Sequence, residues 1–190
     1  MSKALVIVPT YNEADNIINI IQSVLLLSVD FNILIVDDNS PDKTGVLVNS
    51  FALKNSERVF LLSRNLKEGL GKAYTDGFNW ALNNKYDYIF EMDADFSHDP
   101  NDLVRMYNEL SISNFDVVIG SRYINGINVV NWPLSRIILS YFASFYSRII
   151  TGMPVKDATS GFVGYKAKVL KEITLDSIMC KGYAFQIECK

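Results

Sequence analysis

The residues with the clearest chemistry are two aspartates, Asp93 and Asp95, which are separated by Ala94 and follow an apolar run. On a turn, carboxylates at positions i and i+2 can converge on one hard cation such as Mg²⁺ or Mn²⁺. Like charges held this close repel each other, and a bound cation compensates for that repulsion. Because no Lys or Arg lies between Tyr86 and Val104, the sequence predicts a divalent metal site at these aspartates.

Polar residues also follow the other apolar runs that are typical of strands. In an open α/β sheet, ligands bind outside the carboxyl ends of the strands, so function is expected at these points. Capping of the following helix is the alternative for any one aspartate. For the whole set we favour a ligand site. The strand-end residues are Pro9, Tyr11 and Glu13 after 5–8, Asp37 and Asp38 after 31–36, and Arg122 after 117–120.

Several other enzyme sites are excluded by the residues present. The segment 69–74 lacks the third glycine of a dinucleotide fingerprint, and Lys72 is followed by Ala73 instead of the Ser or Thr of a phosphate-binding loop. His98 is the single histidine, which excludes a site with several histidine ligands. Ser160 has no neighbouring histidine for a hydrolase triad. Hydride transfer and P-loop hydrolysis are therefore not expected.

The elements that must position these residues alternate between apolar runs and amphipathic helical patterns, which is typical of βαβ units. After residue 120 the alternation stops, and 124–131 is a polar loop with glycine and asparagine. The sequence therefore predicts an α/β fold, a single domain with a mainly parallel sheet flanked by helices. Strands are predicted at 5–8, 31–36, 59–63, 88–92 and 117–120, and helices at 14–27, after 37–42, at 70–83 and at 99–110.

The composition is that of one globular domain, with 190 residues, 49% of them hydrophobic, and a net charge of −3. Residues 1–119 carry 17 acidic and 9 basic side chains, a balance of −8, whereas residues 120–190 carry 4 and 9, a balance of +5. This division favours a cation as partner of the first half and an anion as partner of the second. The modest net charge of −3 argues against a general nucleic-acid binder. Two cysteines without a disulfide framework, and no run long enough for a membrane span, indicate the cytoplasm.

Two further regions carry weaker expectations. His98 follows the acidic turn, and we expect a solvent-facing loop residue there, with a weak metal or phosphate contact as the alternative. Near the end of the chain, Tyr183 and Phe185 are expected to pack from one face of a strand, with Gln186 and Glu188 on its other face. A role for Gln186 near a sugar is the alternative there.

Five motifs occur in the order and at the spacing found in family 2 nucleotide-sugar glycosyltransferases, which the chain resembles over essentially its whole length. They are 8–13, 36–42, 92–95, 120–123 and 157–162. Within that family the chain is similar to the dolichol-phosphate (polyprenol-phosphate) mannosyltransferases. The features of this subfamily are Asn131-Trp132-Pro133, Ser135-Arg136 and the segment 181–188.

The resemblance implies a GT-A fold, which is Rossmann-like, and transfer of mannose from GDP-mannose to a lipid phosphate with inversion and a divalent cation. Catalytic importance falls on Asp95, Arg122 and Arg136. The implied guanosine contacts are Pro9, Tyr11, Glu13 and Asp38, with Asp37 beside them; Asp93 and Asp95 hold Mg²⁺ or Mn²⁺ on the diphosphate, and Ala94 lines the nucleotide. The implied contacts of the acceptor phosphate are Arg122, Arg136 and Ser140.

A helix predicted over 133–150 bears on the acceptor. Arg136 and Ser140 stand four residues apart, so both project from one face toward a shared anionic ligand. Two interpretations of its apolar residues stay open: the helix lies in the membrane interface and presents the lipid phosphate, or its apolar face packs on the sheet. The residues concerned are Ile138, Phe142, Phe145 and Ile149.

The chain departs from the family pattern in two ways. Ser97 stands where relatives place a glutamine as a further metal ligand, which leaves the third ligand open. The chain also ends at Lys190, and we expect that the catalytic domain over 1–190 is C-terminally truncated, with a nucleotide-sugar and metal half over 1–119 and an acceptor half over 120–190. The expected place is the cytoplasmic face of a membrane, as a peripheral protein, with a membrane-anchored partner subunit possible.

Two alternatives remain for the activity itself. The first is a polyprenyl-phosphate glucosyl or aminosugar transferase that uses a UDP-sugar. The second is a truncated nucleotide-binding module without turnover. An acceptor that is already an anion fits the residues well, because an ionised phosphate needs no general base, whereas a sugar hydroxyl does.

Overall fold

The computed structural model describes residues 2–113, 115–123, 134–173, 175 and 183–189, with 134–137 and 183 described by their backbone alone. In this part of the chain one sheet has the order β3-β2-β1-β4-β6-β5. β1 pairs in parallel with β2 and β4, β3 pairs in parallel with β2, and β6 runs antiparallel to β4 and β5. The strands are β1 (Ala4–Thr10), β2 (Phe31–Asp37), β3 (Val59–Ser63), β4 (Tyr88–Glu91), β5 (Val117–Ile119) and β6 (Val163–Lys166).

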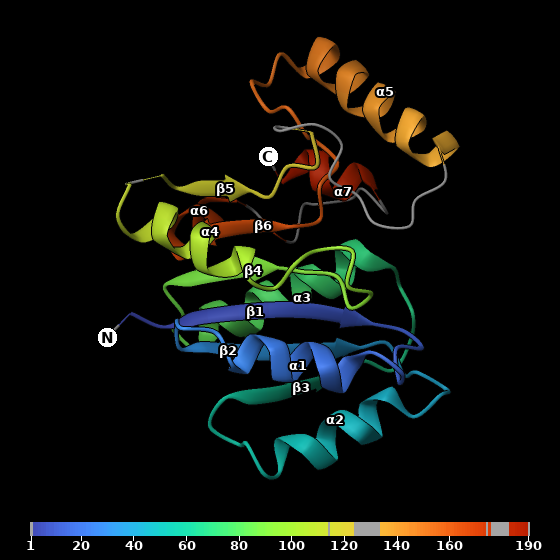
Figure 1. Ribbon diagram of the computed structural model, residues 1–190, viewed down its shortest axis with the longest axis vertical. Coiled ribbons are helices and arrows are strands. Elements are labelled where there is room, and N and C mark those ends of the chain that lie inside the picture. Colours follow the sequence, from blue (N-terminus) through green and yellow to red (C-terminus); the bar gives the residue numbers. More distant parts are fainter. Residues whose placement is uncertain (1, 114, 124–133, 174, 176–182, 190) are drawn as a thin grey trace.

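Helices cover both faces of this sheet (Figure 1). One hydrophobic core contains side chains of α1, α2 and α4, and the other contains side chains of α3, α6 and α7. The single-domain α/β fold with a mainly parallel sheet is thereby confirmed. The helices are α1 (Ile17–Leu25), α2 (Thr44–Ala52), α3 (Leu70–Asn83), α4 (Asp102–Ser111), α5 (Leu134–Thr151), α6 (Ala167–Glu172) and α7 (Tyr183–Glu188).

The buried strands place the polar residues that follow them. Alternate residues of β1 enter opposite cores, with Val6 and Val8 in the core of α1 and Leu5 and Ile7 in the core of α3. Residues 5–8 are therefore all apolar and do not alternate with polar residues, as expected for a parallel strand covered on both faces. The register pairs Thr10 with Asp37, so the chain leaves β1 and β2 at the same edge of the sheet.

The sequence pattern does not predict β6, which enters the sheet between β4 and β5 and makes it mixed. Gly164 lies inside β6, and glycine has a low propensity for β-strands. That glycine is required by packing, because a Cβ atom on Gly164 would lie 2.7 Å from Cε1 of Phe90. A strand glycine of this kind marks a close approach, but its partner is visible only in the folded chain.

The strand expected near the end of the chain is wrong, because residues 183–188 form the short helix α7. Phe185 and Gln186 are both buried, and the ring of Phe185 stacks on that of Tyr74 with 6.0 Å between centroids. Gln186 donates a hydrogen bond from Nε2 to Oε2 of the buried Glu91, over 2.9 Å. Adjacent buried residues are compatible with a short helix that packs against the sheet. Its six residues are too few to show a helical period in the sequence.

Helix α5 lies outside the sheet and its flanking helices (Figure 1). Of the two interpretations of its apolar residues, packing on the sheet is wrong, because Ile138, Phe142, Phe145 and Ile149 are between 48% and 63% exposed. Among the side chains of α5 that the structure describes, Ser144 and Ser147 are instead the buried ones, at 2% and 8% exposure. No helix in the described part of the chain is long and apolar enough to span a membrane.

Candidate active site

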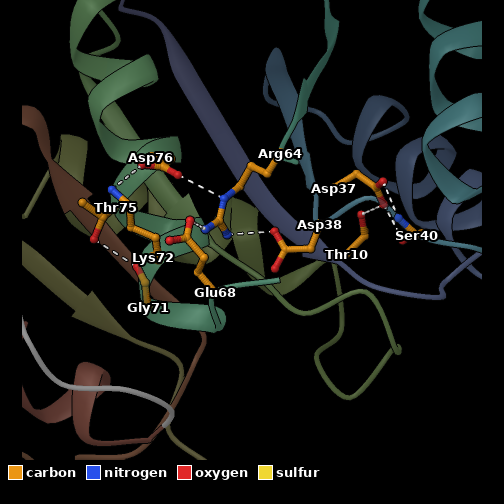
Figure 2. A network of polar contacts seen from close by, with 10 residues as sticks. All are labelled: Thr10, Asp37, Asp38, Ser40, Arg64, Glu68, Gly71, Lys72, Thr75 and Asp76. Atoms are coloured by element: carbon orange, nitrogen blue, oxygen red, sulfur yellow. Dashed lines mark hydrogen bonds and ion pairs between the residues drawn. The ribbon is translucent and has the colours of Figure 1, made fainter. Parts of the chain in front are cut away.

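The two aspartates after β2 have separate tasks. Asp37 is buried, and its Oδ1 accepts hydrogen bonds from Oγ1 of Thr10 at 2.9 Å and from Oγ of Ser40 at 2.6 Å. Its Oδ2 accepts the Ser40 backbone N–H at 3.0 Å. A Cβ atom on Gly45 would also lie 3.0 Å from that oxygen. Asp37 therefore fixes the loop after β2, and Figure 2 shows it turned away from Asp38.

Asp38 faces a buried arginine that the sequence analysis did not single out. Nη1 of Arg64 lies 2.7 Å from Oδ1 of Asp38, and the guanidinium also contacts Glu68 at 3.0 Å and Asp76 at 3.1 Å. Lys72 completes the group with a 2.9 Å contact to Asp76 (Figure 2). The side chain of Arg64 is only 6% exposed, so three carboxylates hold one desolvated cation in a fixed orientation. Arg64 directly follows β3, so the strand-end rule applied to β2 also points to it.

Burial shifts the pKa of the Asp38 carboxyl group. Desolvation raises the pKa of its carboxyl group above the ordinary value, and the charge and hydrogen bond of Arg64 act in the opposite direction. The neighbouring charge of Asp37 raises this pKa further, and Lys67 lowers it. A carboxylate that is buried in this way, yet paired on one oxygen, suits recognition of a ligand N–H group.

The loop after β1 is tied to the loop after β2. Glu13 accepts from the side-chain amide of Asn16 at 3.2 Å, and its backbone N–H donates to Oγ1 of Thr44 at 3.0 Å. Tyr11 is 38% exposed, and Nζ of Lys67 lies 3.6 Å from the centroid of its ring. Pro9 lies on β1 beside Val36 of β2. The predicted nucleoside residues therefore come from loops at the same edge of the sheet.

The loop after β4 carries the two predicted metal ligands. The side chain of Asp93 is 39% exposed, and Asp95 is exposed, with its Oδ1 accepting the Ser97 N–H at 2.9 Å. Ala94 points into the hydrophobic core, so only its backbone faces this loop. Among the residues that the structure describes, no three His, Cys, Asp or Glu side chains already stand together as a metal site. Two carboxylates in one turn still fit a hard cation.

The expectation of a solvent-facing His98 is wrong. Its side chain is 9% exposed, and its ring stacks on Phe162 with 4.8 Å between centroids and 12° between planes. Burial lowers the pKa of His98 to about 4, against the opposing effect of the Asp95 charge. Nδ1 of His98 lies 4.0 Å from Oδ2 of Asp93 and has no hydrogen-bond partner in the described part of the chain.

Arg122 is held by a carboxylate from a distant part of the chain. Its Nε and Nη2 donate to Oδ2 and Oδ1 of Asp157 at 2.8 Å and 2.6 Å, and its backbone N–H also donates to Oδ2 at 3.0 Å. Nη2 donates further to Oγ1 of Thr159 at 2.8 Å, and Ser144 of α5 lies 3.4 Å from that oxygen. Asp157 opens the motif 157–162, but nothing in the sequence indicates a role for its side chain. Its task of orienting Arg122 is visible only in the structure.

The two other predicted acceptor residues lie on α5. Ser140 is half-buried there. Arg136 is part of the same helix, but its side chain lies outside the described residues.

The loop 157–162 brings the two sides of the site together. A Cβ atom on Gly161 would lie 3.5 Å from Oδ2 of Asp93, so the backbone of this loop passes beside the acidic turn. Ser160 ties the same loop to β5 by donating to the carbonyl oxygen of Gly120 at 2.8 Å. The carboxylates of Asp93 and Asp95 and the fixed guanidinium of Arg122 thus share one edge of the sheet. Such an arrangement can neutralise one anionic group with a cation and orient a second one with an arginine.

Comparison with known proteins identifies the family of this chain. Glycosyl transferase family 2 matches residues 5–174. The chain is 44% identical over 186 residues to a polyprenol monophosphomannose synthase from Mycolicibacterium smegmatis, covering 98% of this chain and 70% of that protein. It is 41% identical to an undecaprenyl-phosphate mannosyltransferase from Micrococcus luteus, covering 98% of this chain and 75% of that protein.

Solved structures share the fold at lower identity. A mannosyltransferase from Pyrobaculum calidifontis in complex with GDP-Man and Mn²⁺ is 18% identical, with a TM-score of 0.60 over 90% of this chain and 46% of that one. The glucosyl-3-phosphoglycerate synthase from Mycobacterium tuberculosis with Mn²⁺ and UDP is also 18% identical, with a TM-score of 0.63 over 98% of this chain and 63% of that one. This chain therefore spans less than two thirds of the length of either structure.

Proposed function

Because the chain belongs to glycosyl transferase family 2, we propose that it transfers mannose from GDP-mannose to a polyprenyl phosphate such as dolichyl phosphate, with inversion. The observation that carries the proposal is the similarity over 98% of the chain to two proteins named for polyprenyl-phosphate mannosyl chemistry. In this proposal residues 1–119 bind the nucleotide sugar and residues 120–190 bind the acceptor.

On the donor side, Asp38 recognises the guanine base. Nη1 of Arg64 contacts Oδ1 of Asp38 and fixes the orientation of the carboxylate. The same contact therefore also sets the direction of the other oxygen, Oδ2. Guanine presents adjacent N1–H and N2–H donors on one edge, and a carboxylate accepts both, whereas uracil offers a single N–H. Pro9, Tyr11 and Glu13 contribute the rest of the nucleoside contact, while Asp37 holds the loop.

Asp93 and Asp95 hold Mg²⁺ or Mn²⁺ on the diphosphate, with the backbone of Ala94 beside the nucleotide. A bound divalent cation supplies charge neutralisation of the leaving diphosphate. The assignment of these ligands is supported by the position of both carboxylates just after β4. It is also supported by solved structures of the same fold that contain Mn²⁺ with a nucleotide or a nucleotide sugar.

On the acceptor side, Arg122, Arg136 and Ser140 bind the phosphate group. The bidentate contact with Asp157 holds the Arg122 guanidinium in one plane, which reduces the entropy lost when an anion binds. A phosphate monoester is ionised near neutral pH, so its oxygen attacks the anomeric carbon without a general base. The division into an acidic donor half and a basic acceptor half follows from this chemistry.

Helix α5 supplies contact with the membrane that holds the lipid. Its exposed side chains include Leu139, Phe142, Tyr146 and Ile150, each more than half exposed. A helix with this many exposed apolar groups and few charges suits the interfacial region of a bilayer. We place the protein as a peripheral enzyme on the cytoplasmic face, where a membrane-anchored partner subunit can also contact it.

The proposal is tested by incubating the purified protein with Mn²⁺, polyprenyl phosphate and GDP-mannose labelled in the sugar. The expected product is extractable into organic solvent and labile to mild acid. UDP-glucose serves as the competing donor in a parallel reaction. Transfer from UDP-glucose in preference to GDP-mannose would contradict the donor assignment, and transfer to a sugar hydroxyl alone would contradict the acceptor assignment.

A further inference from the structure

We propose that His98 is the third protein ligand of the divalent cation, binding through Nδ1 beside Asp93 and Asp95. The inference rests on the proposed metal-dependent function and adds a ligand to it.

The position of Nδ1 is the first argument. It lies 4.0 Å from Oδ2 of Asp93. Two ligand atoms that are each about 2.1 Å from one ion lie about 3.0 Å apart at a right angle and about 4.2 Å apart on opposite sides. The observed separation is within this range, and it is too long for a direct hydrogen bond. A cation therefore fits between the two atoms with small movements of the side chains.

The unmet bonding capacity of Nδ1 is the second argument. The atom is buried and has no hydrogen-bond partner in the described part of the chain. Buried polar atoms nearly always have a partner, and an exception calls for a ligand, an ion or a water molecule. The imidazole ring is one of the commonest metal ligands in proteins.

The support of the ring is the third argument. His98 stacks on Phe162 with 12° between the ring planes, which restricts the tilt of the ring, and in this orientation Nδ1 lies 4.0 Å from Oδ2 of Asp93. Phe162 belongs to the loop that also passes beside Asp93 at Gly161. Metal-binding histidines are normally oriented by groups behind them, and a stacked aromatic ring supplies such orientation here.

Asp95 completes the site when its side chain rotates toward Asp93. Its Oδ1 now accepts the Ser97 N–H at 2.9 Å in an exposed position. Rotation of this exposed carboxylate toward Asp93 costs one solvent-accessible hydrogen bond, worth about 1 kcal/mol. The cation thus assembles two carboxylates and one imidazole, and the nitrogen ligand favours Mn²⁺ or Co²⁺ over Mg²⁺.

The test exploits the fact that the chain contains one histidine. Protein without a polyhistidine tag is prepared with ¹⁵N-labelled histidine, loaded with Mn²⁺ and GDP, and studied by pulsed electron paramagnetic resonance. A ¹⁵N coupling to Mn²⁺ identifies His98 directly, because no other labelled nitrogen is present. Titration with Mn²⁺ in the presence of GDP gives the affinity of each variant.

Three variants separate the ligand from the fold. H98F keeps an aromatic ring against Phe162 and removes the nitrogen, so the melting temperature should change little while Mn²⁺ affinity falls at least about tenfold. H98Q restores an oxygen ligand and should recover part of the affinity. S97A leaves the backbone N–H and should bind Mn²⁺ like the wild type.

The outcomes distinguish the inference from the proposed function. A ¹⁵N coupling that is present in the wild type, together with weaker binding by H98F, supports the inference. Tight Mn²⁺ binding without this coupling, or with equal affinity in H98F, overturns it and leaves the proposed function intact. Absence of any Mn²⁺ binding by the wild type in the presence of GDP overturns the proposed metal dependence, and the inference with it.

Discussion

Replacement of Arg64 by methionine tests how the base site is built. The variant keeps much of the buried aliphatic volume and removes the charge that contacts Asp38, Glu68 and Asp76. Glu68 and Asp76 are 57% and 28% exposed, so water solvates them after the change. Asp38 is 8% exposed, and it is left as a buried carboxylate without its cation.

The expected loss of stability follows from this inventory. Removing one partner of a buried ion pair costs about 3–5 kcal/mol, and we expect about 3 because two of the three carboxylates can be hydrated. For a domain of this size, that corresponds to a melting temperature lower by about 6–12 °C. Loss of an oriented carboxylate at the base is worth about 1.5–3 kcal/mol, so GDP affinity should fall about 10- to 100-fold.

The pH dependence has a definite sign. Burial raises the pKa of Asp38 in the folded protein, and Arg64 lowers it, so removal of Arg64 raises it further. A carboxyl group with a raised folded pKa destabilises the fold when ionised, and the cost disappears as the pH falls through that pKa. Arg64→Met should therefore recover part of its lost stability on acidification from pH 7 toward the raised pKa.

Thermal unfolding and calorimetric titration with GDP provide the measurements. Arg105→Met is the matched control, because this arginine forms a surface pair with Asp102 and is 82% exposed. It should change stability by less than about 1 kcal/mol and leave GDP affinity unchanged. The double variant Arg64→Met with Asp38→Leu should regain stability and still bind GDP weakly. A folded Arg64→Met protein with wild-type GDP affinity would refute the reasoning.

Three further predictions concern the metal, the acceptor and the membrane. Asp95→Ala should abolish metal-dependent GDP binding, measured by titration with and without Mn²⁺, and unchanged dependence would argue against its role as a ligand. Asp157→Asn should lower the free energy of unfolding by about 3 kcal/mol. It should also reduce kcat with polyprenyl phosphate while GDP affinity stays the same. A loss of GDP affinity as large as the loss of kcat would contradict the division into donor and acceptor sides. Paired Phe142→Ser and Phe145→Ser changes on α5 should leave the melting temperature within about 1 °C, because exposed positions contribute little, and should weaken binding to phospholipid vesicles in a sedimentation assay. Unchanged vesicle binding would show that α5 is not the contact.

Much of the fold could be predicted because its parallel half follows simple periodic rules. The apolar runs of β1 and β2 are buried on both faces, and the helix predicted over 70–83 has the observed bounds of α3. The antiparallel strand β6 escaped prediction because a central glycine, required by contact with Phe90, lowers its strand character. Such pairing depends on residues far apart in sequence.

In the candidate site, too, local features could be predicted from the sequence and long-range contacts could not. The strand ends indicate Asp38, Asp93 and Arg122 as candidates, because position relative to a strand is a local property of the sequence. The contacts of Asp157 and His98 are long-range, since Asp157 binds Arg122 across 35 residues and His98 packs on Phe162. Histidine in a polar turn is normally exposed, and only the folded chain shows that this one is covered. The sequence thus indicates the edge of the sheet where the candidate site lies, and the structure shows which residues contact its side chains.

The most direct test of the central claim is mass spectrometry of the lipid formed from GDP-mannose with polyprenyl phosphate and, separately, with the corresponding unphosphorylated polyprenol. The account predicts a polyprenyl phosphate heavier by one hexose residue in the first reaction and no product in the second, because the phosphate is both the nucleophile and the group that Arg122 orients. Equal transfer to the free polyprenol, or no transfer to polyprenyl phosphate by protein that binds GDP-mannose and Mn²⁺, would contradict it.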